Sequence, residues 1–211
     1  MSELLLEHLL NRYPNLNECS TSLKTAHRLL VGTVVNDGLI MTCGNGGSAA
    51  DSEHIVGELM KGFEKKRSLT GPSTELFADY GVDGGYIAEN LQGGIRAISL
   101  VSQTALMTAY MNDAKPDLIF AQQVWAYGRA GDALICISTS GNSKNVLYAA
   151  KTARAKGVRV IALTGKSGGA LQDVSDVAIK VPASLTLEVQ ELHLPVYHYL
   201  CLALEQAFYL D

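Results

Sequence analysis

A histidine and a glutamate, His54 and Glu58, lie four residues apart just after a glycine-rich segment. If this stretch is helical, the spacing places both side chains on one face of the helix, one turn apart. Glu58 follows Ile55, Val56 and Gly57, and partial burial beside such residues raises a carboxyl pKa into the range that suits a general base. A surface His–Glu pair, which is the commoner occurrence, explains the spacing equally well.

A glutamine and two further histidines, Gln190, His193 and His198, lie in an apolar stretch near the C-terminus. Histidines in such a stretch are usually core residues with satisfied hydrogen bonds. His54, Glu58 and His198 could also bind zinc, with water or another oxygen as the fourth ligand. Their spacing does not follow the compact HExxH pattern, so both interpretations stay open.

Three segments rich in glycine and hydroxyl groups suggest a phosphate site. They are CGNGGS at 43–48, STSGNS at 138–143 and LTGKSGG at 163–169, and each follows an apolar run. Glycines let a ligand approach the backbone, and the N–H groups at a helix start attract anions. A plain turn would explain the first segment alone, and an N-cap role would explain Ser143. The first segment matches neither the GxGxxG dinucleotide motif nor the Walker P-loop. Because three such segments recur after strand-like runs, a phosphate-bearing ligand is the leading hypothesis.

These residues need a scaffold, and the chain alternates strand-like apolar runs with helical periodicity. The strand-like runs lie at 38–43, 95–101, 132–138, 158–164 and 176–181. Such alternation predicts an α/β fold, a doubly wound parallel sheet of these five strands flanked by helices, as in the flavodoxin-like three-layer sandwich. Ligands in that fold bind beyond the carboxyl ends of the strands, where the three loops would lie.

The remaining segments are predicted to complete a single domain over residues 1–211. A helical segment covers 1–36 with an interruption near Pro14, and a long apolar helix containing Pro195 covers 186–210. Residues 64–94 are glycine-rich and lack periodicity, which predicts a long loop. Loops of this length inside a compact domain are usually functional or inserted.

The composition is that of a globular protein. Of 211 residues, 47% are hydrophobic and 18% are charged, which excludes a disordered or fibrous chain. The net charge of −4 argues against a nucleic-acid binder. No apolar run reaches the ~18–20 residues of a membrane span, and the N-terminus lacks the basic region of a signal peptide. Four widely spaced cysteines predict reduced thiols and a cytoplasmic location.

Taken in order along the chain, these motifs resemble the sugar-isomerase (SIS) domain family. They are GNGGS followed by His54 and Glu58, then Asn112-Asp113, STSGNS, LTGKSGG and QELHLPVYH. More narrowly, the chain looks like the phosphoheptose isomerases, which convert sedoheptulose 7-phosphate to D-glycero-D-manno-heptose 7-phosphate. The resemblance covers roughly 38–63 and 97–208.

The resemblance implies roles for individual residues. Glu58 is the expected general base and His198 its acid–base partner, in an isomerisation that passes through an enediol. The family's zinc ligands correspond to His54, Glu58, Gln190 and His198. Its substrate-binding residues correspond to Asn45, Gly46, Gly47, Ser48, Glu58, Asn112, Asp113, Ser138, Thr139, Ser140, Ser143 and Gln190. The resemblance also implies a homotetramer with active sites at subunit contacts.

The sequence departs from the family pattern close to the expected sugar site. The segment 64–96 is longer than usual, and Lys61 and Gly62 stand where an arginine is common. These differences leave the exact sugar open, so an isomerase of another phosphosugar is one alternative. A sugar-phosphate sensor or regulator without catalysis is another, although a sensor has no need of the Glu58/His198 pair.

The two C-terminal ligands of the implied zinc set present a geometrical difficulty. Gln190 and His198 are eight residues apart, which is about 12 Å on a straight helix at ~1.5 Å per residue. Either Pro195 bends the helix, or the two side chains serve sites in different subunits. The apolar stretch 192–210 also needs a partner surface, so we expect a homo-oligomer.

Overall fold

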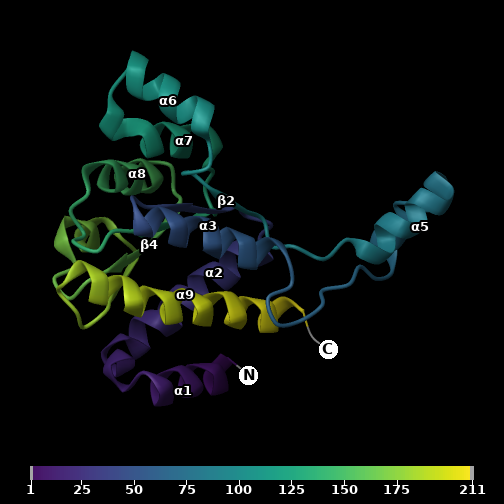
Figure 1. The fold of residues 1–211 in the computed structure, drawn as a ribbon, viewed down its shortest axis with the longest axis horizontal. Coiled ribbons are helices and arrows are strands. Elements are labelled where there is room, and N and C mark those ends of the chain that lie inside the picture. Colours follow the sequence, from purple (N-terminus) through teal and green to yellow (C-terminus); the bar gives the residue numbers. More distant parts are fainter. Residues whose placement is uncertain (1, 210–211) are drawn as a thin grey trace.

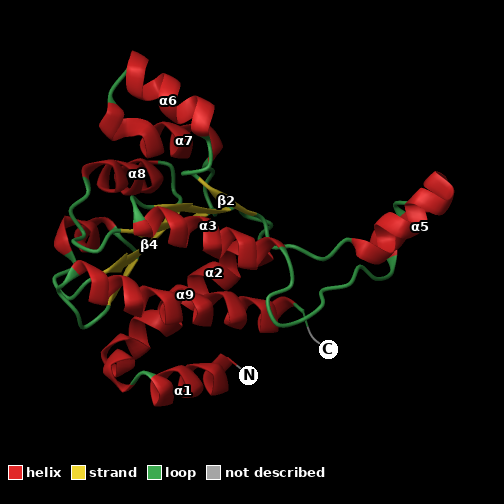
Figure 2. Ribbon diagram, viewed as in Figure 1, coloured by secondary structure: helices red, strands yellow, loops and turns green. Residues whose placement is uncertain are grey.

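The computed structural model describes residues 2–209, and its centre is a five-stranded parallel sheet with the order β2-β1-β3-β4-β5 (Figures 1 and 2). The strands are β1 (Ile40–Cys43), β2 (Ala97–Ser99), β3 (Ala133–Ile137), β4 (Arg159–Thr164) and β5 (Val177–Lys180). This is the doubly wound order of flavodoxin-like folds. The predicted fold class is therefore confirmed, strand by strand.

Helices cover both faces of the sheet and give three layers (Figure 2). One layer contains α1 (Ser2–Arg12), α2 (Ser20–Val35), α3 (Gly47–Met60) and α9 (Thr186–Phe208). The opposite layer contains α6 (Thr104–Asp113), α7 (Ile119–Tyr127) and α8 (Lys144–Ala155). Short 3-10 turns lie at Pro14–Cys19, Ala78–Tyr80, Pro116–Leu118 and Gly169–Val174.

The strands read as continuous apolar runs because both faces of the sheet are buried. Ile40 and Ile135 belong to the core beneath α2 and α9, whereas Met41 and Leu134 belong to the core beneath α7 and α8. Successive side chains of a strand point to opposite faces. A strand covered on both faces is therefore mostly apolar, and the buried Thr42 of β1 satisfies its hydroxyl by donating to the Ser52 carbonyl oxygen.

The cysteines are free and buried, as the sequence predicts. Cys43 and Cys136 are register partners on β1 and β3, with their Sγ atoms 3.9 Å apart. Burial, together with the neighbouring Cys43, raises the pKa of Cys136, so this thiol stays protonated and unreactive. Within residues 2–209, no helix is both long enough and apolar enough to cross a bilayer.

The terminal helices differ in detail from the sequence-based prediction. The segment 1–36 forms two helices, α1 and α2, and a 3-10 turn that begins at Pro14 separates them. The helix predicted over 186–210 is α9, which ends at Phe208, and residue 210 lies outside the described residues. Pro195 lies inside α9 without ending it, although it removes one N–H donor from the helix.

The segment 64–94 contains helices, so the prediction of a featureless loop is wrong. The helices α4 (Pro72–Glu75) and α5 (Gly81–Asn90) belong to an arm, residues 68–94, that projects from the body (Figure 1). The two ends of the arm meet, because Ser68 and Gln92 form an antiparallel bridge. Glycines with positive φ at the helix starts, and more inside α5, hide the helical period in the sequence.

Candidate active site

The helices α3 and α9 lie side by side with their N-termini at the same end of the molecule. Gly47 at the start of α3 lies against Gln190, so closely that a Cβ at Gly47 would be 2.3 Å from Gln190 Nε2. Further along both helices, His54 Nδ1 lies 3.0 Å from the Tyr197 hydroxyl. The functional residues predicted on these two helices therefore face each other.

One cluster contains the side chains of His54, Glu58 and His198, as expected from the sequence. His54 Nε2 lies 3.2 Å from Glu58 Oε1, and the rings of His54 and His198 are 5.1 Å apart and nearly perpendicular. The Glu58 side chain is 13% exposed and the His54 side chain 42%. The carboxylate is thus largely withdrawn from solvent but still open to a small ligand.

The environment of His198 favours its neutral form. Burial lowers the pKa of His198, the nearby His54 lowers it further, and Glu58 offsets part of this change. A neutral imidazole can accept a proton or bind a metal. Its Nε2 atom is buried and has no hydrogen-bond partner among residues 2–209. Such an atom is available to bind a ligand, a water molecule or an ion.

Tyr197 and Asp51 extend the cluster, and sequence reasoning missed both. The Tyr197 hydroxyl donates to Asp51 Oδ1 at 3.2 Å and lies beside His54 Nδ1. Burial raises the pKa of Asp51, while the hydrogen bond from Tyr197 and the proximity of His54 act in the opposite direction. The spacing of Asp51 and His54 along α3 was a possible signal, but Tyr197 reads as one more apolar residue of α9.

Lys61 contacts the predicted base directly. Its Nζ lies 3.1 Å from Glu58 Oε2 and 3.0 Å from the Gly62 carbonyl oxygen. The two oxygens of Glu58 therefore have different partners, with His54 on one and Lys61 on the other. This lysine supplies positive charge beside the carboxylate, in the segment where the resemblance implies an arginine.

A buried ion pair anchors the chain that follows α3. Arg67 Nε donates to Glu205 Oε1 at 2.9 Å, and both side chains are almost completely buried. Glu205 also accepts the backbone N–H groups of Phe63 and Glu64. Burial alone would raise the pKa of Glu205, but these donors and Arg67 hold it below the usual value. The anchor holds Phe63, whose ring packs edge-on against His198.

Gln190 does not join the His54, Glu58 and His198 cluster within one chain. It lies against Gly47 of the glycine loop, near the start of α9, whereas His198 lies eight residues further along the helix. Since α9 runs unbroken through Pro195, a bend at the proline does not bring Gln190 to His198. The explanation that stays open is that Gln190 and His198 serve sites in different subunits.

The three predicted phosphate loops meet at the carboxyl edge of the sheet. Asn45 and Asn145 exchange amide hydrogen bonds of 2.9 and 2.8 Å, which tie the first loop to the start of α8. The Gly165 N–H donates to the Thr139 carbonyl oxygen at 2.9 Å, which joins the second loop to the third. The loops converge because β1, β3 and β4 are neighbours in the sheet.

Hydroxyl and N–H groups gather at the helix starts beside these loops. Ser138 Oγ lies 3.1 Å from Ser143 Oγ, and Ser143 is the N-cap residue of α8. Ser140 Oγ accepts a backbone N–H of its own loop at 3.2 Å. At the first loop, Gly46 caps α3 with a φ of 55°, and Ser48 is buried in the first turn. A phosphate fits such a set of donors.

Asn112 and Asp113 are placed away from this cluster. They end α6, where both are exposed and Asn112 Nδ2 donates to Asp113 Oδ1 at 2.8 Å. Figure 1 shows α6 on the far side of α7 and α8 from α9. Within one chain, the structure therefore does not bring these two predicted substrate ligands to Glu58.

Comparison with known proteins identifies the family to which this fold belongs. A model of the SIS domain matches residues 8–100 and 72–165. The chain belongs to the SIS domain family. A phosphoheptose isomerase of Thiobacillus denitrificans is 42% identical over 181 residues, which cover 84% of this chain and 79% of the relative. At that similarity, the chain belongs among the phosphoheptose isomerases of the SIS family.

Solved structures extend the likeness to nearly the whole chain. The phosphoheptose isomerase of Neisseria gonorrhoeae is 33% identical with a TM-score of 0.72, covering 97% of this chain and 98% of its own. The enzyme of Francisella tularensis is 31% identical with a TM-score of 0.76, covering 92% and 91%. The three-layer fold is therefore that of the isomerases in this family.

Proposed function

We propose that this protein is an aldose–ketose isomerase that converts sedoheptulose 7-phosphate to D-glycero-D-manno-heptose 7-phosphate. The relatives that match almost the full chain are phosphoheptose isomerases. The observation that carries the proposal is the contact of Glu58 with His54 beside the neutral His198, on helices that begin at the phosphate loops. A binding module without catalysis has no use for this cluster.

The chemistry needs two proton movements and no co-reactant. A base removes a proton from C1 of the ketose, and the resulting enediol takes a proton back at C2 to give the aldose. We assign the carbon-bound proton to Glu58, whose partly buried carboxylate faces the cluster. The neutral His198 moves the proton between the O1 and O2 oxygens, which is ordinary general acid–base catalysis.

The phosphate end of the sugar is assigned to the second loop. Ser138, Thr139, Ser140 and Ser143 supply hydroxyl and backbone donors at the start of α8. Binding the remote phosphate fixes the distance from the phosphate to the reacting carbons, which lowers the entropic part of the barrier. The sugar itself is assigned to the residues that form the glycine loop or lie against it, which are Asn45, Gly46, Gly47, Ser48 and Gln190.

We further propose a zinc ion on this cluster, as a Lewis acid that polarises the substrate carbonyl when bound. The donor chemistry fits, because His54 Nδ1 is engaged by Tyr197 while its Nε2 faces Glu58, and His198 Nε2 lacks a partner among residues 2–209. Among residues 2–209, no three His, Cys, Asp or Glu side chains of one chain are grouped to hold a metal. The full set with Gln190 therefore requires more than one copy.

That requirement supports the proposal of a homo-oligomer, a homotetramer by analogy with the family, with active sites at subunit contacts. Asn112 and Asp113, which are exposed and remote from Glu58, also need another subunit to reach a sugar. We place the protein in the cytoplasm, which is consistent with its free thiols.

Turnover of the proposed substrate tests the function directly. The protein is incubated with sedoheptulose 7-phosphate, and proton NMR follows the aldehyde-derived signals of the aldose. We expect conversion to an equilibrium mixture, with exchange of one carbon-bound proton for deuterium in D₂O through the enediol. Binding of the sugar phosphate with neither conversion nor exchange would make the protein a sensor instead.

A further inference from the structure

The arm, residues 68–94, carries an apolar face that its own chain leaves uncovered. Val82 and Tyr86 lie one turn apart on α5 and are 91% and 70% exposed, and Leu76 and Tyr80 are exposed to a similar degree. Of residues 68–94, all of which the structure describes, Gly84 alone is buried. Clusters of exposed apolar side chains mark interaction sites in soluble proteins.

The arm cannot hold its helix by local interactions. The helix α5 has 10 residues, whereas an isolated helix shorter than ~12–15 residues is marginal in water. Gly81, Gly84 and Gly85 lie within it, and glycine further weakens a helix interior. The conformation of the arm therefore calls for a surface that packs against its apolar face.

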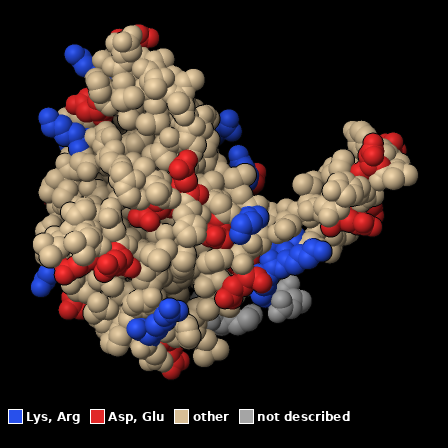
Figure 3. All heavy atoms as spheres, in the orientation of Figure 1, with Lys and Arg blue, Asp and Glu red and all other residues tan. Residues whose placement is uncertain are grey.

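The charge of the arm narrows the choice of partner. It carries Glu75, Asp79, Asp83 and Glu89 and has no lysine or arginine, and Figure 3 shows these acidic groups on the projecting end. The whole chain has 21 acidic and 17 basic residues, so the arm accounts for its entire formal excess. An anionic membrane or a nucleic acid would repel the arm. An apolar surface with a basic rim would attract it.

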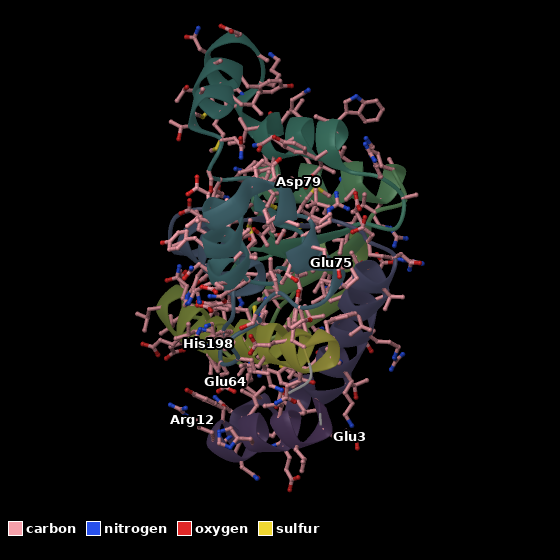
Figure 4. The ribbon with its side chains drawn as sticks, turned by 90° about the vertical axis from the view of Figure 1, so that its right-hand side faces the viewer. Glu3, Arg12, Glu64, Glu75, Asp79 and His198 are labelled. Atoms are coloured by element: carbon pink, nitrogen blue, oxygen red, sulfur yellow. The ribbon has the colours of Figure 1, made fainter. Side chains whose placement is uncertain are left out.

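Such a surface exists on the chain itself, in a groove between α1 and α9. The groove has a volume of about 260 Å³, which is below the roughly 300–1,000 Å³ of small-molecule sites. It is lined by Leu5, His8, Leu9, Arg12, Tyr13, Leu194, Pro195, His198 and Tyr199. Among residues 2–209, no acidic side chain lines this groove. Figure 4 shows Arg12 and His198 on the same side of the two helices, with Glu64 labelled between them in this view and with Glu75 and Asp79 apart from them on the arm.

We propose that the arm of one copy of this chain seats in the α1/α9 groove of a second copy. Val82 and Tyr86 pack on the apolar floor, and Asp83 pairs with Arg12. The arm cannot reach the groove of its own chain, because its base is fixed by Arg67 and Gln92 and it points away from the body. A twofold arrangement makes the contact reciprocal, so each dimer contains it twice.

The seated arm would also cover one side of the acid–base cluster, because His198 lines the same groove. The proposal goes beyond the isomerase function, since it names the segment and the surface that bring two copies together. Its test reads association and proximity rather than turnover. A failure of the substrate assignment and a failure of the arm contact would therefore be told apart.

Cross-linking between two differently tagged variants tests the contact. Val82→Cys and Leu194→Cys are mixed and oxidised mildly, and the native cysteines are all buried. We expect a disulfide-linked species that contains both tags. Val35→Cys, which replaces an exposed apolar residue outside the groove, takes the place of Leu194→Cys as the matched control. A yield no higher than this control, or a link between two Val82→Cys arms, would overturn the proposal.

Charge exchange tests the same contact without oxidation. Asp83→Arg and Arg12→Glu should each weaken self-association roughly fivefold, at the upper end for exposed ion pairs, as measured by analytical ultracentrifugation. The combined variant should recover the affinity, because the pair is restored with its signs exchanged. Arg129→Glu, which changes an exposed arginine outside the groove, serves as the control and should change nothing. Losses that add in the combined variant would contradict the pairing.

Discussion

The Tyr197 hydroxyl lies 3.0 Å from His54 Nδ1, although 143 residues separate them in the chain. Because that hydroxyl gives its own proton to Asp51 Oδ1, it accepts a proton from Nδ1 of the imidazole. This fixes the tautomer and directs His54 Nε2 towards Glu58. Tyr197 is therefore a positioning residue, which acts on the reaction through His54.

Removing this hydroxyl should lower activity without lowering stability to match. We expect Tyr197→Phe to reduce kcat/KM by ~10–100-fold, the range for partners that orient a functional histidine. Tyr199→Phe removes a hydroxyl from another buried ring of α9 and is the control. Equal losses in the two variants would indicate packing instead of positioning.

Glu58→Gln should abolish most of the turnover while leaving the fold intact. The amide keeps the size of the side chain but cannot take the carbon-bound proton, and such groups contribute ~10²–10⁴-fold. Steady-state rates and loss of deuterium exchange measure the effect. Glu53→Gln, on the same helix and hydrogen-bonded to Ser102 instead, should behave as wild type. Glu58→Gln with more than about half of the normal rate would refute the role of base.

The serine loop should discriminate phosphorylated from unphosphorylated sugars. Ser138→Ala combined with Ser140→Ala removes two of the hydroxyl groups near the start of α8. We expect the Kd for sedoheptulose 7-phosphate to rise by roughly tenfold or more, since bonds to a charged group contribute ~1.5–3 kcal/mol. The weak binding of unphosphorylated sedoheptulose should not change. Calorimetry on both ligands decides, and equal losses would place the phosphate elsewhere.

Removal of zinc should lower the rate, and added zinc should restore it. His54, Glu58 and His198 supply two imidazoles and a carboxylate, a common ligand set for zinc. Within residues 2–209 of one chain, however, they are not grouped to hold the ion, so we expect a second copy to complete the site. The affinity should fall in acid, because protons compete with the metal for the imidazoles, and burial, which lowers the pKa of His198, delays this loss at that ligand. Metal content and rate are measured on the same chelated sample. Full activity at negligible zinc would leave Glu58 and His198 as an unassisted acid–base pair.

His193 should make stability depend on pH. Burial lowers its pKa to about 4, despite the nearby Thr164 carbonyl, whereas the unfolded chain has an ordinary value of ~6.5. The unfolded state therefore binds more protons between these values, and stability falls as the pH drops from about 6.5 to about 4. The total loss is about 3 kcal/mol. The free energy of unfolding, measured in urea, should depend less on pH in His193→Gln than in the wild type. The exposed control His8→Gln should keep the wild-type dependence.

The parts of this structure that follow local rules were predictable from the sequence. The strand Ala133–Ile137 is apolar at every position because the sheet is covered on both faces, and glycines and hydroxyls mark the loop that follows it. The His54–Glu58 pair was visible because a helix fixes its spacing. These features depend on neighbours within a few residues.

The features that the sequence did not reveal depend on contacts between distant segments. Nothing in the apolar pattern of α9 marks Tyr197 as a partner of Asp51. The pair Arg67 and Glu205 looks like two ordinary charged residues until folding buries them together. The helix α5 was missed because its glycines interrupt the apolar period. It is also almost entirely exposed, so no buried face requires such a period.

The closed base of the arm has a consequence for how such chains diversify. The Gly62 N–H donates to Gln92 Oε1, and the Gly93 N–H donates to the Arg67 carbonyl oxygen, so the chain leaves and re-enters the body at one point. A loop with joined ends can change length at an entropic cost that grows only slowly. The segment between these bonds can therefore change in length or sequence without displacing the rest of the chain. Its gain, loss or replacement in descendants would alter which molecules assemble, while the isomerase body beneath kept its fold.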